Sequence, residues 1–276
     1  MWNDCGMRPP KKLADFDQIR LCVRGMDVRV FESAVFTGPE FVLIHGFGVS
    51  SRYFGPLAKE LSQHGRVLVL DLPGFGKTRA PDHALRIPDF ADVVNEVIRE
   101  LSVISPVLIG HSMGTQVAVE ALIRAPCLSH GAVLAGPVVN DRERRAGLLL
   151  WRFAQSAVKE TPTSAWASIR GFVNSGPRWL IRDFGPMLNY RIEDRLSETE
   201  APLAVVGGTG DRIAPPDWCR RLAGTRDGID VVVVEGAAHE MIHTHATEVA
   251  RVALQLAKSR STGSQRPSPG LPPCGD

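Results

Sequence analysis

Hydrophobic residues in this chain alternate between short continuous runs and longer spaced patterns. Two early stretches, 19–23 and 27–32, predict an opening antiparallel pair of strands. Six later runs are continuously apolar and β-branched, as buried strands are; they cover 41–44, 67–72, 106–110, 132–136, 203–208 and 230–236. Between the first four of these six runs, apolar positions lie three and four apart in residues 52–65, 89–101 and 112–125, which predicts helices. The alternation indicates an α/β fold with a mostly parallel sheet and helices on both faces.

The alternation is interrupted once, between residues 138 and 199. This segment has no strong strand pattern, yet it carries Trp151, Trp166 and Trp179. It is too long and too apolar for a loop, so we interpret it as a helical insertion that covers the sheet. The three tryptophans are candidates for the wall of a substrate pocket, although such side chains also bury against a sheet for packing alone.

The organisation that follows is a core interrupted by one insertion. We expect an N-terminal extension over 1–18, a core over 19–137 and 200–257, the helical cap over 138–199, and a tail over 258–276. The tail is crowded with Ser, Gly and Pro and has little to bury, which is typical of a disordered segment.

Composition and charge exclude some classes of partner. The 276 residues include 32 basic and 30 acidic side chains, a net charge of +2 with the two signs interspersed. No single-sign field points to nucleic acid or to an anionic membrane. No run reaches the roughly 20 apolar residues of a spanning helix, and the N-terminus lacks the pattern of a signal peptide. A soluble, cytoplasmic protein is expected, whose oligomeric state remains open.

The five cysteines are scattered and include no C-x-x-C pair, and no histidine stands at metal-ligand spacing. Reduced thiols and no metal site are therefore expected.

Residues 71–78, DLPGFGKT, end with the letters of a phosphate-binding loop. The early glycine of that motif is replaced by Asp71, whose carboxylate would repel a polyphosphate, and Pro73 lacks an N–H donor. Nucleotide binding is therefore not expected, and Lys77 needs another explanation.

Candidate chemistry follows the strand at 106–110, where GHSMG matches G-x-S-x-G between a predicted strand and a predicted helix. Gly110 and Gly114 permit a turn so sharp that the serine projects from it. Ser112 is therefore the candidate nucleophile, with a helix N-terminus behind it to favour developing negative charge.

A serine nucleophile needs a base, and the base needs a carboxylate. Asp211 and His239 each follow a predicted strand, and Ser112, Asp211 and His239 occur in that order along the chain. Asp141 is a rival for the acid. His243 and His245 are rivals for the base, but they precede the apolar stripe of the last helix and are expected to face solvent or cap that helix.

The strand at 41–44 is followed by HGFG. The small residue Gly46 lets backbone N–H groups face a carbonyl oxygen, so we assign the oxyanion hole to the N–H groups of Phe47 and Met113. His45 and His111 each lie beside a structural turn and are not expected to act as the base.

The segments HGFG, DLPGFGKT, GHSMG, GTGD and GAAH stand in the order found in the α/β-hydrolase family, which the chain resembles over residues 19–257. The resemblance implies an eight-stranded sheet, a helical cap after the sixth strand, a Ser112–His239–Asp211 triad and no cofactor. It also implies that DLPGFGKT is the family's structural turn after the fourth strand, with Lys77 in solvent.

Departures from related subgroups narrow the expected chemistry. Carbon–carbon bond hydrolases on this scaffold usually have an aromatic residue where Glu240 stands and a small one where Thr115 stands, and epoxide hydrolases have aspartate in place of Ser112. We therefore expect a serine hydrolase acting on a carboxylic ester, lactone or thioester of a small, mostly apolar molecule. The alternatives left open are a C–C bond hydrolase or lyase, and a non-catalytic ligand receptor.

Overall fold

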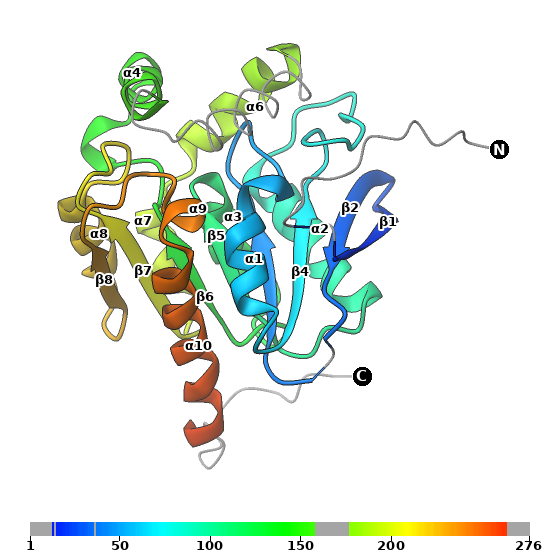
Figure 1. Cartoon of the computed structure of the whole chain (residues 1–276). Coiled ribbons are helices and arrows are strands. Elements are labelled where there is room, and N and C mark those ends of the chain that lie inside the picture. The colour runs from blue at the N-terminus through cyan, green and yellow to red at the C-terminus, as the bar shows by residue number, and fades with distance from the viewer. Residues whose placement is uncertain (1–12, 14, 36, 158–176, 264–276) are drawn as a thin grey trace.

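An eight-stranded sheet forms the centre of the protein in a computed structural model, which describes residues 13, 15–35, 37–157 and 177–263 (Figure 1). The strand order is β1-β2-β4-β3-β5-β6-β7-β8. Strand β2 pairs antiparallel with β1 and with β4, and all other neighbours are parallel. The strands are β1 Asp17–Val23, β2 Met26–Glu32, β3 Glu40–Ile44, β4 Arg66–Asp71, β5 Val107–His111, β6 Gly131–Ala135, β7 Leu203–Gly208 and β8 Asp230–Val234. The predicted mostly parallel sheet with an opening antiparallel pair is confirmed.

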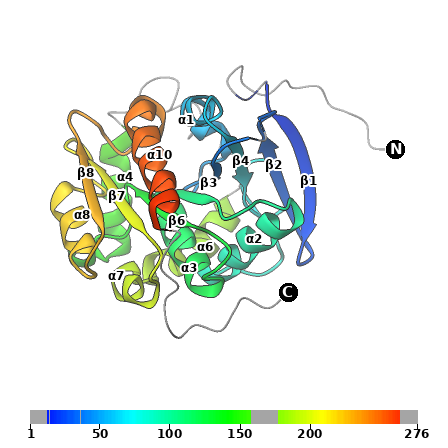
Figure 2. The same cartoon turned by 90° about the horizontal axis from the view of Figure 1, so that it is seen from below.

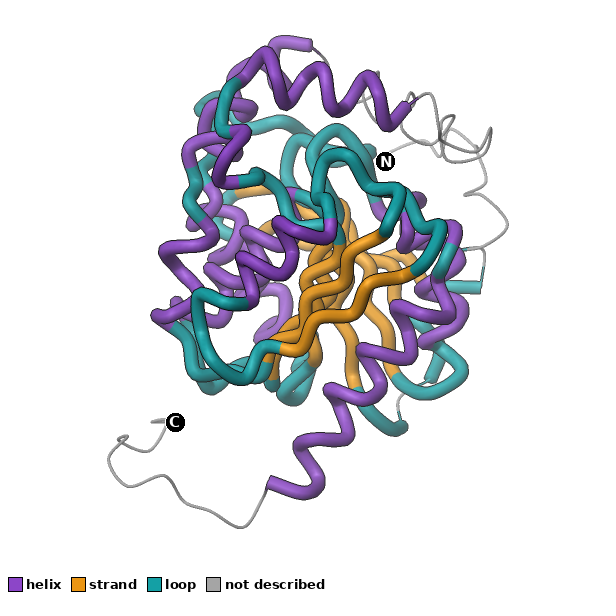
Figure 3. Tube along the Cα trace, turned by 90° about the vertical axis from the view of Figure 1, so that its left-hand side faces the viewer, coloured by secondary structure: helices purple, strands orange, loops and turns teal. Residues whose placement is uncertain are grey.

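Helices cover both faces of the sheet, as Figure 2 shows from below. One face carries α2 (Ile87–Glu100), α3 (Met113–Arg124) and α8 (Pro216–Ala223), and the other carries α1 (Gly55–Leu61) and α10 (Ala246–Gly263). The short η1 (Ser51–Phe54) precedes α1, and α9 (Met241–Thr244) precedes α10. Figure 3 shows the sheet between these two layers.

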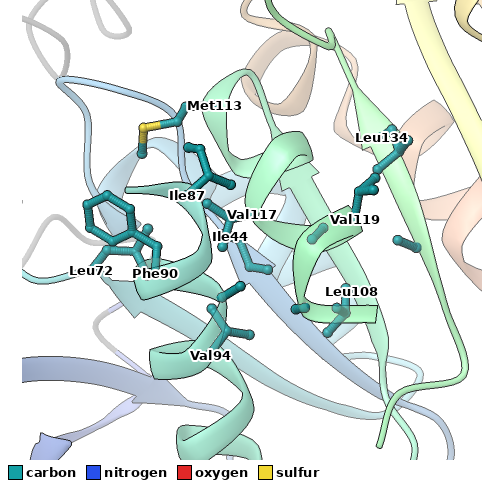
Figure 4. Packing of buried hydrophobic residues seen from close by; sticks show 14 of the residues in the cluster. Ile44, Leu72, Ile87, Phe90, Val94, Leu108, Met113, Val117, Val119 and Leu134 are labelled. Atoms are coloured by element: carbon teal, nitrogen blue, oxygen red, sulfur yellow. The ribbon is translucent and has the colours of Figure 1, made fainter. Parts of the chain in front are cut away.

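The parallel strands are buried on both sides because successive side chains point to opposite faces. In β4, Leu68 and Leu70 pack under α2 and α3, whereas Val67 and Val69 pack under α1 and α10. Figure 4 shows the first of these two clusters, in which α2 and α3 meet the sheet. The core therefore holds the carboxyl ends of β3 to β7 rigidly in register.

Strand β8 and the last helix differ from the sequence predictions, the strand in its burial and the helix in its length. The β8 run was expected to be buried, but Val231, Val232 and Val233 are only half-buried because β8 is an edge strand. The last helix, α10, continues to Gly263 and so extends six residues into the expected tail over 258–276. Its apolar positions Val249, Val252 and Ala253 bury against the sheet and nucleate a helix that continues past them.

The segment between β6 and β7 contains α4 (Ala146–Ala157), α6 (Pro177–Asn189) and α7 (Ile192–Arg195), with the short 3-10 turns η2 (Asp141–Glu143) and η3 (Leu196–Glu198). Figure 1 shows α4 and α6 above the sheet. Of the three tryptophans expected to line a pocket, Trp179 is buried and Trp151 on α4 is 59% exposed. Trp166 lies outside the described residues.

Helix α6 is docked on the loop that follows β4. The Trp179 ring covers Gly74, where a Cβ would lie 2.1 Å from Cε2, and meets the Phe75 ring edge-on. Arg182 donates hydrogen bonds to the carbonyls of Pro81 and Asp82, and Asp183 accepts one from the Leu85 N–H. Gly74 is therefore required by close packing as well as by its positive φ of 82°.

The end of the segment between β6 and β7 packs on α3, which carries two buried polar residues one turn apart. The Gln116 amide donates to the carbonyls of Val138, Met187 and Tyr190 at 3.1–3.4 Å. Glu120 accepts hydrogen bonds from the Tyr190 hydroxyl and from Arg195. Gln116 and Glu120 thereby tie α3 to the segment between β6 and β7.

Among the described cysteines, Cys22 and Cys219 are free thiols and Cys127 is disulfide-bonded. The expectation of reduced thiols is therefore wrong at Cys127, an exposed residue after α3. None of the helices in the described ranges combines the length and the hydropathy that a membrane span requires.

Candidate active site

Ser112 lies in the turn between β5 and α3 with φ 55° and ψ −120°, a left-handed conformation that non-glycine residues rarely adopt. Its neighbours two positions away must be glycine. A Cβ on Gly110 would lie 2.2 Å from the Gly114 carbonyl oxygen, and one on Gly114 would lie 2.0 Å from the Ile44 carbonyl oxygen. The Ser112 N–H donates to the Ala135 carbonyl at 3.0 Å, which fixes the turn to the end of β6.

The HGFG loop after β3 lies directly against the serine. A Cβ on Gly46 would lie 2.8 Å from Ser112 Cβ and 3.3 Å from its Oγ. Within the described part of the chain, the backbone N–H groups of Phe47 and Met113 donate to no acceptor. The two N–H groups assigned to the oxyanion hole thus flank Ser112 with their donor capacity unused.

Asp211 and His239 meet at the ends of β7 and β8. His239 Nδ1 lies 2.8 Å from Asp211 Oδ2, and the other carboxylate oxygen accepts the N–H groups of Ile213 and Ala214. Burial alone raises the pKa of the Asp211 carboxyl, but the attraction of His239 and these hydrogen bonds outweigh it and hold that pKa below its ordinary value. Because a carboxylate only accepts, Nδ1 carries the proton.

The end of β6 brings the serine and the histidine to one place. Ala135 accepts the Ser112 N–H, and the next residue, Gly136, lies under the imidazole: a Cβ there would lie 3.1 Å from His239 Nδ1 and 3.4 Å from Asp211 Oδ2. His239 Nε2 is buried and has no hydrogen-bond partner among the described residues. The nitrogen that would accept the serine proton is therefore available.

The rivals for the acid and the base have other partners. Asp141 forms an ion pair with Arg221 at 2.7 Å and accepts the Arg142 N–H at 2.9 Å. His243 Nδ1 lies 3.3 Å from the Tyr53 carbonyl oxygen, and His245 Nδ1 lies 2.9 Å from the Thr244 hydroxyl. Among these candidates, the structure brings only Asp211 and His239 together.

His45 has a structural role. Its Nε2 accepts the Leu72 N–H at 3.1 Å, so its Nδ1 carries the proton and donates to the Gly46 carbonyl at 2.8 Å. Burial lowers the pKa of His45, which keeps the ring neutral and fixes the HGFG loop to the turn after β4.

The turn with the partial phosphate-loop motif is also structural. The Asp71 carboxylate is buried and is bound by Arg29 from β2 and by the Ser51 N–H at 2.7 Å. Gly76 has a φ of 63°, and a Cβ there would lie 2.5 Å from that carboxylate. Lys77 is exposed, and its carbonyl accepts a hydrogen bond from Arg20. Asp71 thus shapes the loop around an arginine rather than around a phosphate.

The sequence analysis missed three features of this region: the role of Arg29, the role of Gly136, and the contact between His111 and His239. Arg29 is 42 residues from Asp71 and meets it only because β2 pairs with β4. Gly136 carried a usable signal, since a glycine that ends a strand beside the active-site edge often permits a close approach. No set of residues in the described ranges has the composition and spacing of a metal site.

The eight-stranded fold and the arrangement of Ser112, Asp211 and His239 at strand ends define the class of α/β hydrolases. The alpha/beta hydrolase family matches residues 41–252, and the chain belongs to this family.

Named relatives include hydrolases of several substrates. The (E)-2-((N-methylformamido)methylene)succinate hydrolase of Acinetobacter baylyi is 28% identical over 238 residues, which cover 79% of this chain and 89% of that protein. A pimeloyl-[acyl-carrier protein] methyl ester esterase of Pseudoalteromonas atlantica is 34% identical over 131 residues, which cover 45% of this chain and 49% of that protein. These relationships support a hydrolase in general.

Solved structures share the fold. The enol-lactonase of Burkholderia xenovorans superposes with a TM-score of 0.74 at 19% identity, over 87% of this chain and 100% of that one. An esterase of Exiguobacterium antarcticum gives a TM-score of 0.75 at 19% identity, over 87% of this chain and 98% of the esterase chain.

Proposed function

We propose that the protein is a serine hydrolase that cleaves a carboxylic ester, lactone or thioester of a small, mostly apolar molecule through an acyl-enzyme at Ser112. The observation that carries the proposal is the Asp211–His239 hydrogen bond at 2.8 Å, at the sheet edge where Ser112 stands, with no partner for His239 Nε2 among the described residues. The proposal is also supported by the position of all three residues just after strand ends, which a plain strand-to-helix turn at Ser112 would not require.

In this mechanism Ser112 Oγ attacks the carbonyl carbon while His239 Nε2 accepts its proton. Asp211 holds the imidazole in the required tautomer and stabilises the imidazolium that forms. The N–H groups of Phe47 and Met113 donate to the oxyanion, and the N-terminus of α3 adds a favourable field. His239 then returns the proton to the leaving oxygen or sulfur, and a water hydrolyses the acyl-enzyme by the same steps in reverse.

Aromatic rings lie beside the loop that contains the proposed oxyanion donor Phe47. The Phe47 ring lies 5.9 Å from Phe184 of α6 and 6.0 Å from Phe75, so the loop that supplies one oxyanion donor packs directly beneath the cap. Aromatic side chains at this point favour an apolar acyl or alcohol group. A pocket role for Trp151 is less favoured because of its exposure.

A second candidate reaction is the hydrolysis of a substrate without an ester, and one relative favours it. The Acinetobacter baylyi hydrolase aligns over most of both chains, and the substrate in its name has an N-methylformamido group and a succinate but no ester. A C–C bond hydrolase or lyase, or a receptor that retains the fold without the chemistry, is distinguished by the same experiment.

The test is a panel of substrates assayed with the wild type and with Ser112→Ala. It contains p-nitrophenyl esters of increasing acyl length, a γ-lactone, an acyl thioester, a vinylogous 1,5-diketone and an enamide dicarboxylate. We expect saturable, Ser112-dependent turnover of esters, lactones or thioesters. Turnover confined to the diketone or the enamide, or none with any compound, would reject the ester reaction.

A further inference from the structure

His111 lies beside the proposed nucleophile but has no part in the acyl-transfer steps. It is the last residue of β5 and is only 3% exposed. Its ring is enclosed by two others: the His239 ring, with centroids 4.9 Å apart, and the Tyr53 ring, at 5.5 Å. A buried imidazole in contact with the proposed base needs an explanation beyond its place in the serine turn.

The hydrogen bond of His111 fixes its tautomer. Its Nε2 lies 2.8 Å from the backbone carbonyl oxygen of His239. Since a carbonyl only accepts, Nε2 carries the proton and donates it. In the neutral ring Nδ1 is then a bare lone pair, and this atom is buried with no partner among the described residues.

The surroundings keep His111 neutral. Burial, together with the repulsion of His239, lowers the pKa of His111 to about 3, while Asp211 partly opposes the shift. The other titratable groups facing this cluster are His45 from the loop after β3, Tyr53 from η1 and His243 from α9. Protonation of His111 would place an unpaired N–H beside the base.

We propose that His111 is a positioning residue for His239. This inference rests on the proposed function. Asp211 fixes the rotation of the His239 ring through Nδ1, but it does not fix the backbone from which the ring projects. That backbone leaves β8 through Gly236, which has a φ of 72° and donates its N–H to the Thr209 hydroxyl at 2.8 Å. The Ala237 carbonyl accepts the Gly210 N–H at 2.9 Å, so these contacts tie the turn to the loop after β7 and not to the serine turn.

Asp211 holds the His239 ring, and the side-chain N–H of His111 holds the His239 backbone. It ties the His239 carbonyl to the residue adjacent to Ser112, so the base and the nucleophile share one rigid support on β5. Proton transfer demands donor and acceptor within hydrogen-bond distance, and a displacement of about 1 Å can cost up to roughly 100-fold in rate.

Two substitutions separate this role from packing. His111→Phe fills the same space between His239 and Tyr53 but donates no hydrogen bond. His111→Gln places an amide N–H about as far from the backbone as Nε2 and restores the donor. His243→Phe is the matched control, because it changes the other imidazole beside the Tyr53 ring, with centroids 6.0 Å apart, and leaves the His111 N–H donor in place.

The assay measures kcat and KM on p-nitrophenyl butyrate from about pH 5 to pH 9, with the melting temperature of each variant. We expect His111→Phe to lower kcat about 10- to 100-fold with KM within about twofold, His111→Gln to recover most of that loss, and His243→Phe to stay within about twofold. The acidic limb of the kcat/KM profile should stay at the wild-type pH in His111→Gln, since a neutral His111 does not titrate there.

Equal losses in the Phe and Gln variants, or a loss that follows melting temperature, would overturn the positioning role, as would a shifted acidic limb in His111→Gln. The failure of this inference is distinct from that of the proposed function. If Ser112→Ala abolishes turnover but His111→Phe retains wild-type kcat, only the positioning role is wrong. If Ser112→Ala retains turnover, the proposed serine mechanism itself is wrong.

Discussion

Asp211 Oδ2 and His239 Nδ1 lie 2.8 Å apart at the ends of two neighbouring parallel strands, although 28 residues separate them in the chain. Strands β7 and β8 end at the same edge of the sheet, so the loop after each reaches the other. The pair is buried, and the carboxylate is held by two further backbone N–H groups. This contact fixes the tautomer that a serine mechanism requires.

Replacing the carboxylate should remove this control. We expect Asp211→Asn to lower kcat by about 10⁴-fold, because the amide can stabilise the wrong tautomer and cannot stabilise the imidazolium. Asp141→Asn should lose only its ion pair with the partly exposed Arg221 and stay within a few-fold of wild type. Steady-state kinetics of both variants on one activated ester make the comparison. A larger loss at Asp141 would show that the acid is assigned to the wrong residue.

Gly46 offers a test of the oxyanion loop. A methyl group there would lie 2.8 Å from Ser112 Cβ, so Gly46→Ala must displace either the HGFG loop or the serine. We expect kcat to fall by about 10- to 100-fold. Gly147→Ala, where an added Cβ meets no atom within 4 Å, is the matched control and should leave kcat within about twofold. Equal activity of the two variants would contradict the close approach of this loop.

The DLPGFGKT turn should tolerate loss of its lysine but not of its aspartate. Lys77→Ala is expected to keep ester hydrolysis within a few-fold, and calorimetry should detect no saturable ATP binding. Asp71→Asn should lower the free energy of unfolding by about 3–5 kcal/mol, because it leaves the buried Arg29 guanidinium without its counter-charge. Micromolar ATP binding, or an Asp71→Asn variant as stable as wild type, would overturn the structural role of this turn.

Asp183 makes stability depend on pH. Burial raises the pKa of this carboxyl from 3.8 to about 6, against the opposing effects of the Leu85 N–H and Arg182. The folded state therefore binds the proton more tightly than the unfolded chain. The stability that this proton contributes is complete below about pH 4, is lost as the pH rises through about 6, and stays lost above that value.

Asp183→Asn removes this titration. We expect the free energy of unfolding of the variant, relative to wild type, to rise by on the order of 1–3 kcal/mol between about pH 4 and about pH 7. Urea unfolding of both proteins across that range measures the difference. A difference that does not change with pH would show that folding does not raise the pKa of Asp183.

The strands and the strand-end residues of this protein could be predicted because both depend on local pattern. Continuous β-branched runs have few alternatives to a buried parallel strand, and G-x-S-x-G restricts the turn around Ser112 sterically. Burial of the β8 run could not be predicted, because whether a strand lies at an edge depends on the sheet order and not on the run itself.

Contacts between residues far apart in the chain could not be predicted from the sequence either. Arg29 pairs with Asp71 through the β2–β4 register, and His111 meets His239 across 128 residues. The tryptophans between β6 and β7 were equally hard to place from the sequence. Composition alone could not distinguish Trp179, which covers Gly74, from Trp151, which faces solvent, because both are large apolar residues in a helical pattern.

In the proposed mechanism, His239 activates Ser112 as a nucleophile. The most direct measurement is the rate of covalent labelling by a fluorophosphonate, with the modified residue located by peptide mass spectrometry. We expect one adduct per chain, on Ser112, and none on Ser112→Ala. His239→Ala should label at least about 1,000-fold more slowly, while His243→Ala and His245→Ala should label at rates near wild type. Labelling of Ser112→Ala at the wild-type rate, or of His239→Ala as fast as wild type, would contradict the account.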